Sequence, residues 1–231
     1  MYPFYMYWDP TYILVVIGAV ISMIASANVK HSFQKNSRVY NQRGLRAEQV
    51  AEMILRSAGI TDVRIGHVRG DLTDHYDPSS KTVNLSNSVY GSTSVSAVGV
   101  AAHECGHVIQ HARGYVPIQI RTALVPVVNF ASKLSMPMII LGLVLGFVGL
   151  AKIGVILFGA ALVFQLVTLP VEFDASARAM RVLNSLGILG NEEAKGARKV
   201  LTAAALTYVA AVVSTALQVF LLVLLVNNRR D

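Results

Sequence analysis

The chain has 231 residues, of which 54% are hydrophobic and 14% are charged. Soluble domains carry ~25% charged residues, so this composition argues against a soluble globular protein, and it excludes intrinsic disorder. The net charge is +7, which in so apolar a chain indicates membrane topology rather than nucleic-acid binding. Cys105 is the single cysteine, so the sequence has no framework of intrachain disulfides.

Four uncharged segments are long enough to cross a bilayer, which takes ~20 apolar residues. They span residues 10–29, 134–151, 153–171 and 200–228. Lys152 alone separates the second segment from the third. We therefore expect a tight helical hairpin that turns at Lys152, with Gly149 and Gly154 flanking the turn.

The first segment resembles a signal peptide in one respect, because Ala25-Ser26-Ala27 has the composition of a cleavage site. However, the preceding residues MYPFYMYWDP contain no Lys or Arg, whereas a signal peptide begins with positive charge. Trp8 and the tyrosines around it are typical of an interfacial aromatic belt. We expect a retained first membrane helix.

Basic residues predict the orientation of the chain, because cytoplasmic loops are enriched in Lys and Arg. Of the 20 basic residues, 17 lie in the two polar stretches and three lie on the opposite side. The cluster nearest the membrane consists of Lys30, Lys35, Arg38, Arg43 and Arg46. We expect both termini outside and both polar stretches in the cytoplasm, although the tail residues Arg229 and Arg230 argue mildly against this orientation.

The polar stretch 30–133 has the pattern of an α+β region. It predicts a helix over 47–57, short strands around 63–68 and 81–86 with a turn-rich loop at 71–80 between them, and a helix over about 95–112. The segment Ser92–Ser96 offers N-caps for the second helix. Val83 and Leu85 share one face of the later strand, which could be a substrate-binding edge strand or an ordinary core strand.

The helix over 95–112 carries His103-Glu104-Cys105-Gly106-His107, the H-E-x-x-H pattern. Residues four apart share a helix face, so His103 and His107 can bind one Zn²⁺ ion. Glu104 lies one step around the helix, where it can accept a proton from a water on the metal without ligating the metal. Cys105 points to another face and is expected to be buried and inert.

A catalytic zinc needs three protein ligands and one open position. His111 is a poor third ligand, because three collinear side chains on one helix cannot converge on a tetrahedral ion. The metzincin pattern also fails, since Gln110 and Arg113 occupy its glycine and third-histidine positions. Glu172 is the best candidate, because the hairpin returns it to the side that carries the H-E-x-x-H helix. Asp174 competes, but on a helix it points ~200° away from Glu172.

The run DLTDHYDPSSKTVNLSNSVYGSTSVSAVGVAAHECGHVIQH, the hairpin and LPVEFDASARAMR resemble the bacterial membrane-bound neutral zinc metallopeptidase family (YugP-like) over essentially the whole chain. The resemblance implies a zinc-dependent membrane peptidase with His103, His107 and Glu172 as zinc ligands and Glu104 as catalytic base. The order of these elements is also similar to the gluzincin arrangement of the HtpX/Ste24 peptidases.

The sequence departs from the HtpX/Ste24 pattern at two places. Those peptidases have an aspartate four residues after the ligand glutamate, and it orients a zinc histidine. This chain has Ser176 at that position, so the sequence does not identify the residue that orients the histidine. They also have a later histidine that can stabilise the oxyanion, whereas this chain has none after His111. His75, Tyr76 and Arg178 are alternatives for that role. A structured turn, with Asp74 and Asp77 capping backbone groups, explains the DHYDP loop equally well.

The sequence therefore predicts an α-helical integral membrane protein with about four transmembrane helices and a small α+β, zincin-like cytoplasmic part. The expected domains are a membrane helix (1–29), a cytoplasmic insert (30–133), a membrane hairpin (134–171), a cytoplasmic helix with the third ligand (172–199) and a membrane helix with its tail (200–231). The expected activity is zinc-dependent endopeptidase action on membrane or unfolded polypeptides, in a multi-pass protein of the cell membrane with a cytoplasmic site and no nucleic-acid partner. A catalytically silent zinc scaffold and a zinc hydrolase of a non-peptide carbonyl stay open, as does the oligomeric state.

Overall fold

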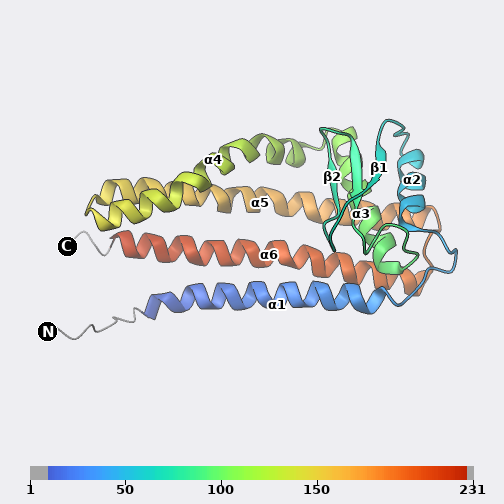
Figure 1. Ribbon diagram of the computed structural model, residues 1–231, viewed down its shortest axis with the longest axis horizontal. Helices are drawn as coiled ribbons and strands as arrows, with labels where there is room; N and C mark the ends of the chain where they lie inside the picture. The colour runs from blue at the N-terminus through green and yellow to red at the C-terminus, as the bar shows by residue number, and fades with distance from the viewer. Residues whose placement is uncertain (1–9, 228–231) are drawn as a thin grey trace. The chain divides into compact units, whose positions relative to one another are not determined.

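The computed structural model describes residues 10–227 (Figure 1). Its elements, in chain order, are η1 (Pro10–Tyr12), α1 (Ile13–Asn36), α2 (Ala47–Ser57), β1 (Arg64–His67), β2 (His75–Asp77), β3 (Thr82–Leu85), α3 (Val95–Ala112), α4 (Val116–Val144), α5 (Val148–Ser185) and α6 (Asn191–Asn227). The predicted aromatic belt around Trp8 and the basic tail at Arg229 and Arg230 lie outside the described residues.

Four of the helices, α1, α4, α5 and α6, are long and apolar enough to cross a membrane. The protein is an α-helical membrane protein with a small α+β part, which confirms the predicted fold class. At 1.5 Å per residue, the 38 residues of α5 extend about 57 Å, roughly twice the hydrocarbon core of a bilayer. Since the uncharged part of α5 ends at Val171, the helix has length to spare for a polar end that begins with Glu172.

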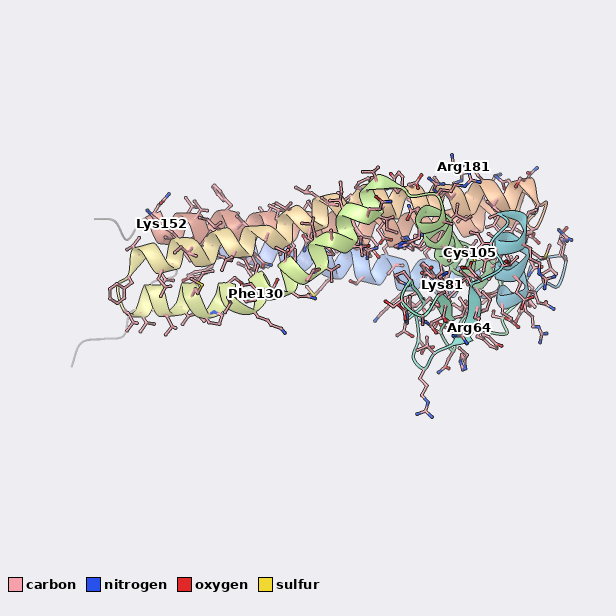
Figure 2. All side chains as sticks on the ribbon, turned by 90° about the horizontal axis from the view of Figure 1, so that it is seen from above. Arg64, Lys81, Cys105, Phe130, Lys152 and Arg181 are labelled. Atoms are coloured by element: carbon pink, nitrogen blue, oxygen red, sulfur yellow. The ribbon has the colours of Figure 1, made fainter. Side chains whose placement is uncertain are left out.

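The described chain forms two compact units. The first comprises residues 10–24, 123–166 and 209–227. Here α4 and α5 form the predicted hairpin, but the turn lies at residues 145–147 and not at Lys152, which is already helical. Gly146 makes this turn with a φ of +73°, a conformation that favours glycine. Lys152 lies near the start of α5 (Figure 2). Its long side chain can carry the charge away from apolar surroundings, so a lysine can occupy the helix itself and does not have to lie in the turn.

The two arms of the hairpin pack closely because glycines face the partner helix. A Cβ atom on Gly154 would lie 2.8 Å from the backbone nitrogen of Ile139, and Gly142 faces Ala151 in the same way. Ile139, Ala151 and Val155 form the apolar contact between the arms. The glycine at 154 therefore serves close helix packing rather than the turn.

The second unit comprises residues 25–122 and 167–208 and holds the sheet, α2 and α3 (Figure 1). The strand order is β1-β3-β2, with β1 parallel and β2 antiparallel to β3. The strand β3 is therefore central, and its residues Val83 and Leu85 are fully buried in the core of this unit. This position is incompatible with the edge-strand interpretation of these two residues. The edge strand β2 lies within the predicted turn-rich loop. Its three residues are too few to show the alternation of apolar and polar residues that predicts a strand, so the sequence did not reveal it.

The helix α3 begins and ends where the sequence predicts. Ser94 caps it by accepting a hydrogen bond from the backbone N–H of Ala97 at 3.2 Å. Gly114, with a φ of +61°, follows the end of α3. Most of α3 is buried, because α2 and the sheet cover it within the core of this unit. The H-E-x-x-H segment therefore lies on a helix that is fixed by packing against α2 and the sheet.

Candidate metal centre

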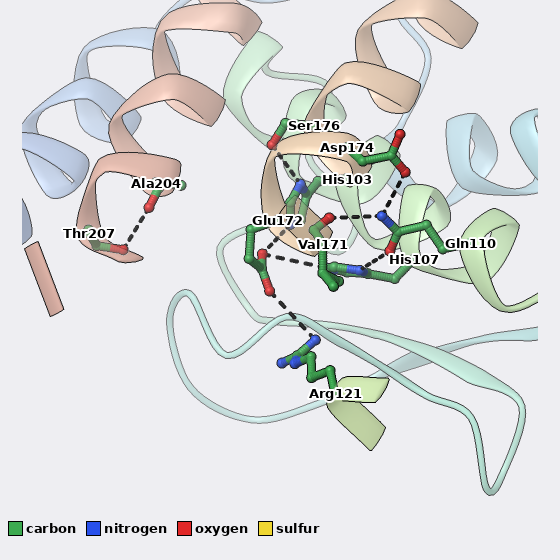
Figure 3. A network of polar contacts seen from close by, with 10 residues as sticks. All are labelled: His103, His107, Gln110, Arg121, Val171, Glu172, Asp174, Ser176, Ala204 and Thr207. Atoms are coloured by element: carbon green, nitrogen blue, oxygen red, sulfur yellow. Dashed lines mark hydrogen bonds and ion pairs between the residues drawn. The ribbon is translucent and has the colours of Figure 1, made fainter. Parts of the chain in front are cut away.

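Three potential metal ligands converge between α3 and α5 (Figure 3). His103 and His107 lie one turn apart on α3, with ring centroids 4.8 Å apart. The Glu172 Oε2 atom lies 3.3 Å from Nε2 of His103 and 3.6 Å from Nε2 of His107. One ligand atom from each residue lies within 4.8 Å of the others, so these three groups could hold one metal ion. The structure thus brings together the three residues that the sequence predicts as ligands.

A glycine permits this close approach of α5 to α3. A Cβ atom built on Gly106 would lie 2.5 Å from the carbonyl oxygen of Ala175, a separation that real Cβ atoms do not adopt. Gly106 occupies the second x position of H-E-x-x-H, so no side chain projects from α3 at this point beside the two histidines. The absence of a side chain there lets Glu172 on α5 reach His103 and His107.

Replacing Gly106 by alanine is expected to push α3 and α5 apart, at a cost of ~1–3 kcal/mol of stability. The separation would also weaken the binding of a metal ion by these three residues, because Glu172 would no longer reach both histidines. Thermal unfolding and zinc titration of the purified G106A variant would measure both effects. The matched control is G159A, since a Cβ on Gly159 would meet nothing within 4 Å. A G106A variant with unchanged melting temperature and zinc affinity would contradict the packing argument.

Each histidine is oriented by a hydrogen bond to its other ring nitrogen. Nδ1 of His103 lies 3.1 Å from Ser176 Oγ, and Nδ1 of His107 lies 3.0 Å from Gln110 Oε1. Because the Gln110 oxygen can only accept, Nδ1 of His107 is the donor. The Nε2 atoms of both histidines are left facing Glu172.

Gln110 links His107 to α5, because its side chain contacts both. It is fully buried, and its Nε2 atom donates to the Val171 carbonyl at 2.8 Å and to Asp174 Oδ2 at 2.9 Å. Ser176 and Gln110 are thus the groups that orient the two histidines, and Asp174 acts through Gln110. Gln110 was not among the residues predicted to support the site, although its spacing of three residues from His107 on one helix was an available signal.

The two oxygens of Glu172 have different partners. Oε2 faces the histidines, while Oε1 lies 3.6 Å from Nη1 of Arg121 on α4, and the carboxylate is almost fully buried. Burial lowers the pKa of His107, but the hydrogen bond to Glu172 and the charge of Glu104 raise it, with a net pKa above the ordinary value. Since a metal needs the neutral imidazole, protons compete with it at this site from a higher pH than at an isolated histidine.

The other candidates of the DHYDP loop have structural roles. Asp74 accepts from the Ser86 backbone N–H at 2.7 Å and from its hydroxyl at 2.8 Å, and Asp77 binds the turn that follows. The ring of Tyr76 packs edge-on against His111 at 5.5 Å, and burial and nearby charges lower the pKa of His111. The capping interpretation of this loop is therefore the one that its contacts support.

Arg178, the remaining candidate for oxyanion stabilisation, contacts Asp174 and Tyr115. Its Nε atom donates to Asp174 Oδ2 at 2.5 Å, and its guanidinium lies 5.4 Å from the centre of the Tyr115 ring. Cys105 is fully buried, and burial raises the pKa of its thiol well above the usual range, in agreement with an inert cysteine. Neither side chain joins the candidate metal centre.

A cavity of about 240 Å³ adjoins two of the three potential ligands, His103 and Glu172. His103, Glu104 and Glu172 line its polar side together with Tyr208 of α6. The remaining wall is mostly apolar. Its apolar members are Val29, Phe33, Leu72, Val100, Val200, Leu201, Ala204 and Ala205, and its polar members are Asp74, Ser176 and Thr207. Space for a reactant therefore exists beside the potential metal site, and Glu104 faces it.

Comparison with known proteins assigns the chain to a family. Residues 11–227 match the model of the family described as "Putative neutral zinc metallopeptidase". The chain belongs to this family. It is also 44% identical to the "Putative membrane protease YugP" of Bacillus subtilis (strain 168) over 221 residues, which cover 95% of this chain and 98% of that protein. No solved structure shows a significant match to the chain.

The family description and the candidate metal centre agree on zinc. Two imidazoles and one carboxylate are a donor set that catalytic zinc sites use, with a fourth position left for water or substrate. Among the described residues, His103, His107 and Glu172 form the one group of three or more potential ligands that could hold a metal ion. The residues present therefore fit the metal that the family name implies.

Proposed function

We propose that this family member is an integral-membrane zinc endopeptidase that hydrolyses peptide bonds at the candidate metal centre. The convergence of Glu172 on the H-E-x-x-H pair beside an accessible cavity carries the proposal. In this assignment His103, His107 and Glu172 hold Zn²⁺ through their Nε2 and Oε2 atoms. The basic-residue distribution supports a cytoplasmic location of the site.

Zinc, when bound, lowers the pKa of a coordinated water and polarises the substrate carbonyl. Glu104 lines the cavity beside His103 and is 7% exposed, so its carboxylate is shielded from bulk solvent. We assign to it the transfer of a proton from the attacking water to the leaving amine. Arg121 lies 3.6 Å from Oε1, the Glu172 oxygen that faces away from the histidines, and would help to hold the carboxylate in its charged form.

Tyr208 takes the role of oxyanion donor in this proposal. Its hydroxyl-bearing ring lines the same cavity, close enough to Glu172 and Glu104 for their charges to act on it. The Y208F variant is expected to lose about 10²–10³-fold in kcat, as when one oxyanion donor is removed, while KM and zinc content change little. Y90F, at an exposed tyrosine in another part of the unit, is the matched control. A Y208F variant with full kcat would remove Tyr208 from the mechanism.

The surroundings of the site favour an extended, apolar substrate segment. The cavity accepts an apolar side chain next to the reacting carbonyl, since most of its wall is apolar. In the described chain, β2 pairs on one side only, and its neighbour Asp74 lines the cavity. A peptide that adds to the free edge of β2 would therefore lead into the cavity.

The alternatives make different demands on the site. A structural zinc normally has four protein ligands, whereas three candidates converge here among the described residues. Glu104 has no function in such a scaffold. A hydrolase of a non-peptide carbonyl would use the same residues, so the choice depends on the substrate.

The deciding experiment measures proteolysis of an unfolded protein by the purified, zinc-loaded chain. We expect cleavage that stops after chelation and returns on addition of zinc, with apolar residues enriched at the cleaved bonds and proline next to them inhibitory. Zinc bound at one ion per chain without cleavage of any polypeptide would contradict the peptidase proposal. An even distribution of residues at the cleaved bonds would contradict the apolar cavity as a specificity site.

A further inference from the structure

A second cavity lies between the end of α1 and the beginning of α6, and it shares no lining residue with the cavity of the candidate metal centre. It is a groove of about 510 Å³. We call it the basic groove, because its lining includes His31, Lys35, Lys195, Arg198 and Lys199 and no acidic residue. All five of these side chains belong to exposed residues.

Helix periodicity places these residues on one face of α1 and one face of α6, and both faces line the groove. His31 and Lys35 are four residues apart on α1, and Lys195 and Lys199 are four apart on α6, so each pair occupies one helix face. Close packing joins the two helices at this level. A Cβ atom on Gly196 of α6 would lie 2.6 Å from Oδ1 of Asn36 on α1. The charges therefore converge across a short helix–helix contact.

The positive charge of the groove is largely uncompensated. Lys195 pairs with Glu192 at 2.6 Å, and the charge of Glu192 also acts on Lys199 from a greater distance. Within residues 10–227, no acidic oxygen lies within the 4.0 Å ion-pair limit of Lys35, Arg198 or Lys199. Like charges that line one groove repel one another, and an anion in the groove would relieve that repulsion.

The groove lies where the apolar parts of two membrane helices end. The uncharged segment of α1 ends at Val29, and that of α6 begins at Val200, directly after Lys199. Along α6 the lining changes from Lys195 and Lys199 to Ala203 and Leu206. A ligand that fits has a negative head at the basic end and an apolar part beside Leu206, which is 45% exposed.

We propose that the basic groove binds the headgroup phosphate of an anionic phospholipid. Lys35, Arg198 and Lys199 neutralise the phosphate, and the acyl chains continue along Ala203 and Leu206. A soluble phosphate would use the basic end alone, whereas the position at the membrane boundary favours the lipid. Basic pockets between membrane helices bind anionic headgroups through this chemistry.

The test uses the full zinc-loaded chain in micelles that contain equal amounts of phosphatidylglycerol and phosphatidylcholine, with bound lipid counted by native mass spectrometry. A basic side chain near an anionic surface strengthens binding about fivefold. We expect at least that preference for phosphatidylglycerol in the parent chain and its loss in the K35Q/R198Q/K199Q variant. The control R56Q/R64Q/R69Q, at exposed arginines outside the groove, should keep the preference.

Two further measurements distinguish binding by charge from an effect on folding. The charge-conserving variant K35R/R198K/K199R should bind phosphatidylglycerol like the parent, and about 1 M NaCl should reduce the preference through screening. Unchanged zinc content of each variant verifies its fold. A preference that survives in K35Q/R198Q/K199Q, or is absent from the parent chain, would overturn the proposal. Displacement of the lipid by inorganic phosphate at equal concentration would identify a soluble-anion site instead.

Discussion

The E104Q variant is expected to lose about 10²–10⁴-fold in kcat for peptide hydrolysis while it keeps one zinc ion per chain. Glutamine has nearly the shape of glutamate, so the packing around this 7% exposed side chain should not change. It cannot accept a proton from water at neutral pH, however. Because the potential ligands are His103, His107 and Glu172, the metal should remain bound.

Parallel measurements of turnover and of zinc by elemental analysis would check this prediction. The E52Q variant removes an exposed carboxylate on α2 and should cleave at the parent rate. Equal cleavage by the parent chain and E104Q would show that a contaminating peptidase is responsible. Loss of zinc from E104Q would instead make Glu104 a ligand and would contradict its assignment as base.

The E172A variant is expected to bind zinc at least a hundredfold more weakly and to lose activity with it. Loss of a residue that only orients a zinc ligand already costs about 10–100-fold in affinity, so loss of a ligand should cost more. The substitution also leaves Arg121 without its carboxylate partner near the site. Zinc titration against a competing chelator measures the affinity directly, without reference to any substrate.

The D174N variant is the matched control for E172A. Asp174 was the competing ligand candidate, and its Oδ2 atom accepts from Gln110 rather than facing the histidine Nε2 atoms. An asparagine oxygen can still accept that hydrogen bond. D174N should therefore keep zinc at one ion per chain, with at most a modest loss of affinity. If D174N lost zinc and E172A kept it, the proposed ligand set would be wrong.

The sequence by itself determined the features that depend on local patterns. Apolar runs of sufficient length identified four membrane-crossing helices, because the bilayer sets a length that a single segment must satisfy. Helix periodicity and capping placed α3 at Val95–Ala112 and put His103 and His107 on one face. Both features involve residues within a few turns of one another, so no knowledge of distant segments was needed.

Only the tertiary structure decided the features that depend on distant segments. Ser176 orients His103, and Arg121 faces Glu172, across separations in sequence that no local pattern spans. The role of Gly106 is visible only when the Ala175 carbonyl of α5 lies against it. Likewise, Val83 and Leu85 alternate as an edge strand or a central strand would, and pairing of β3 on both sides decides between the two. The sequence thus supplied the ligand types and helix faces, and packing between segments determined which groups meet.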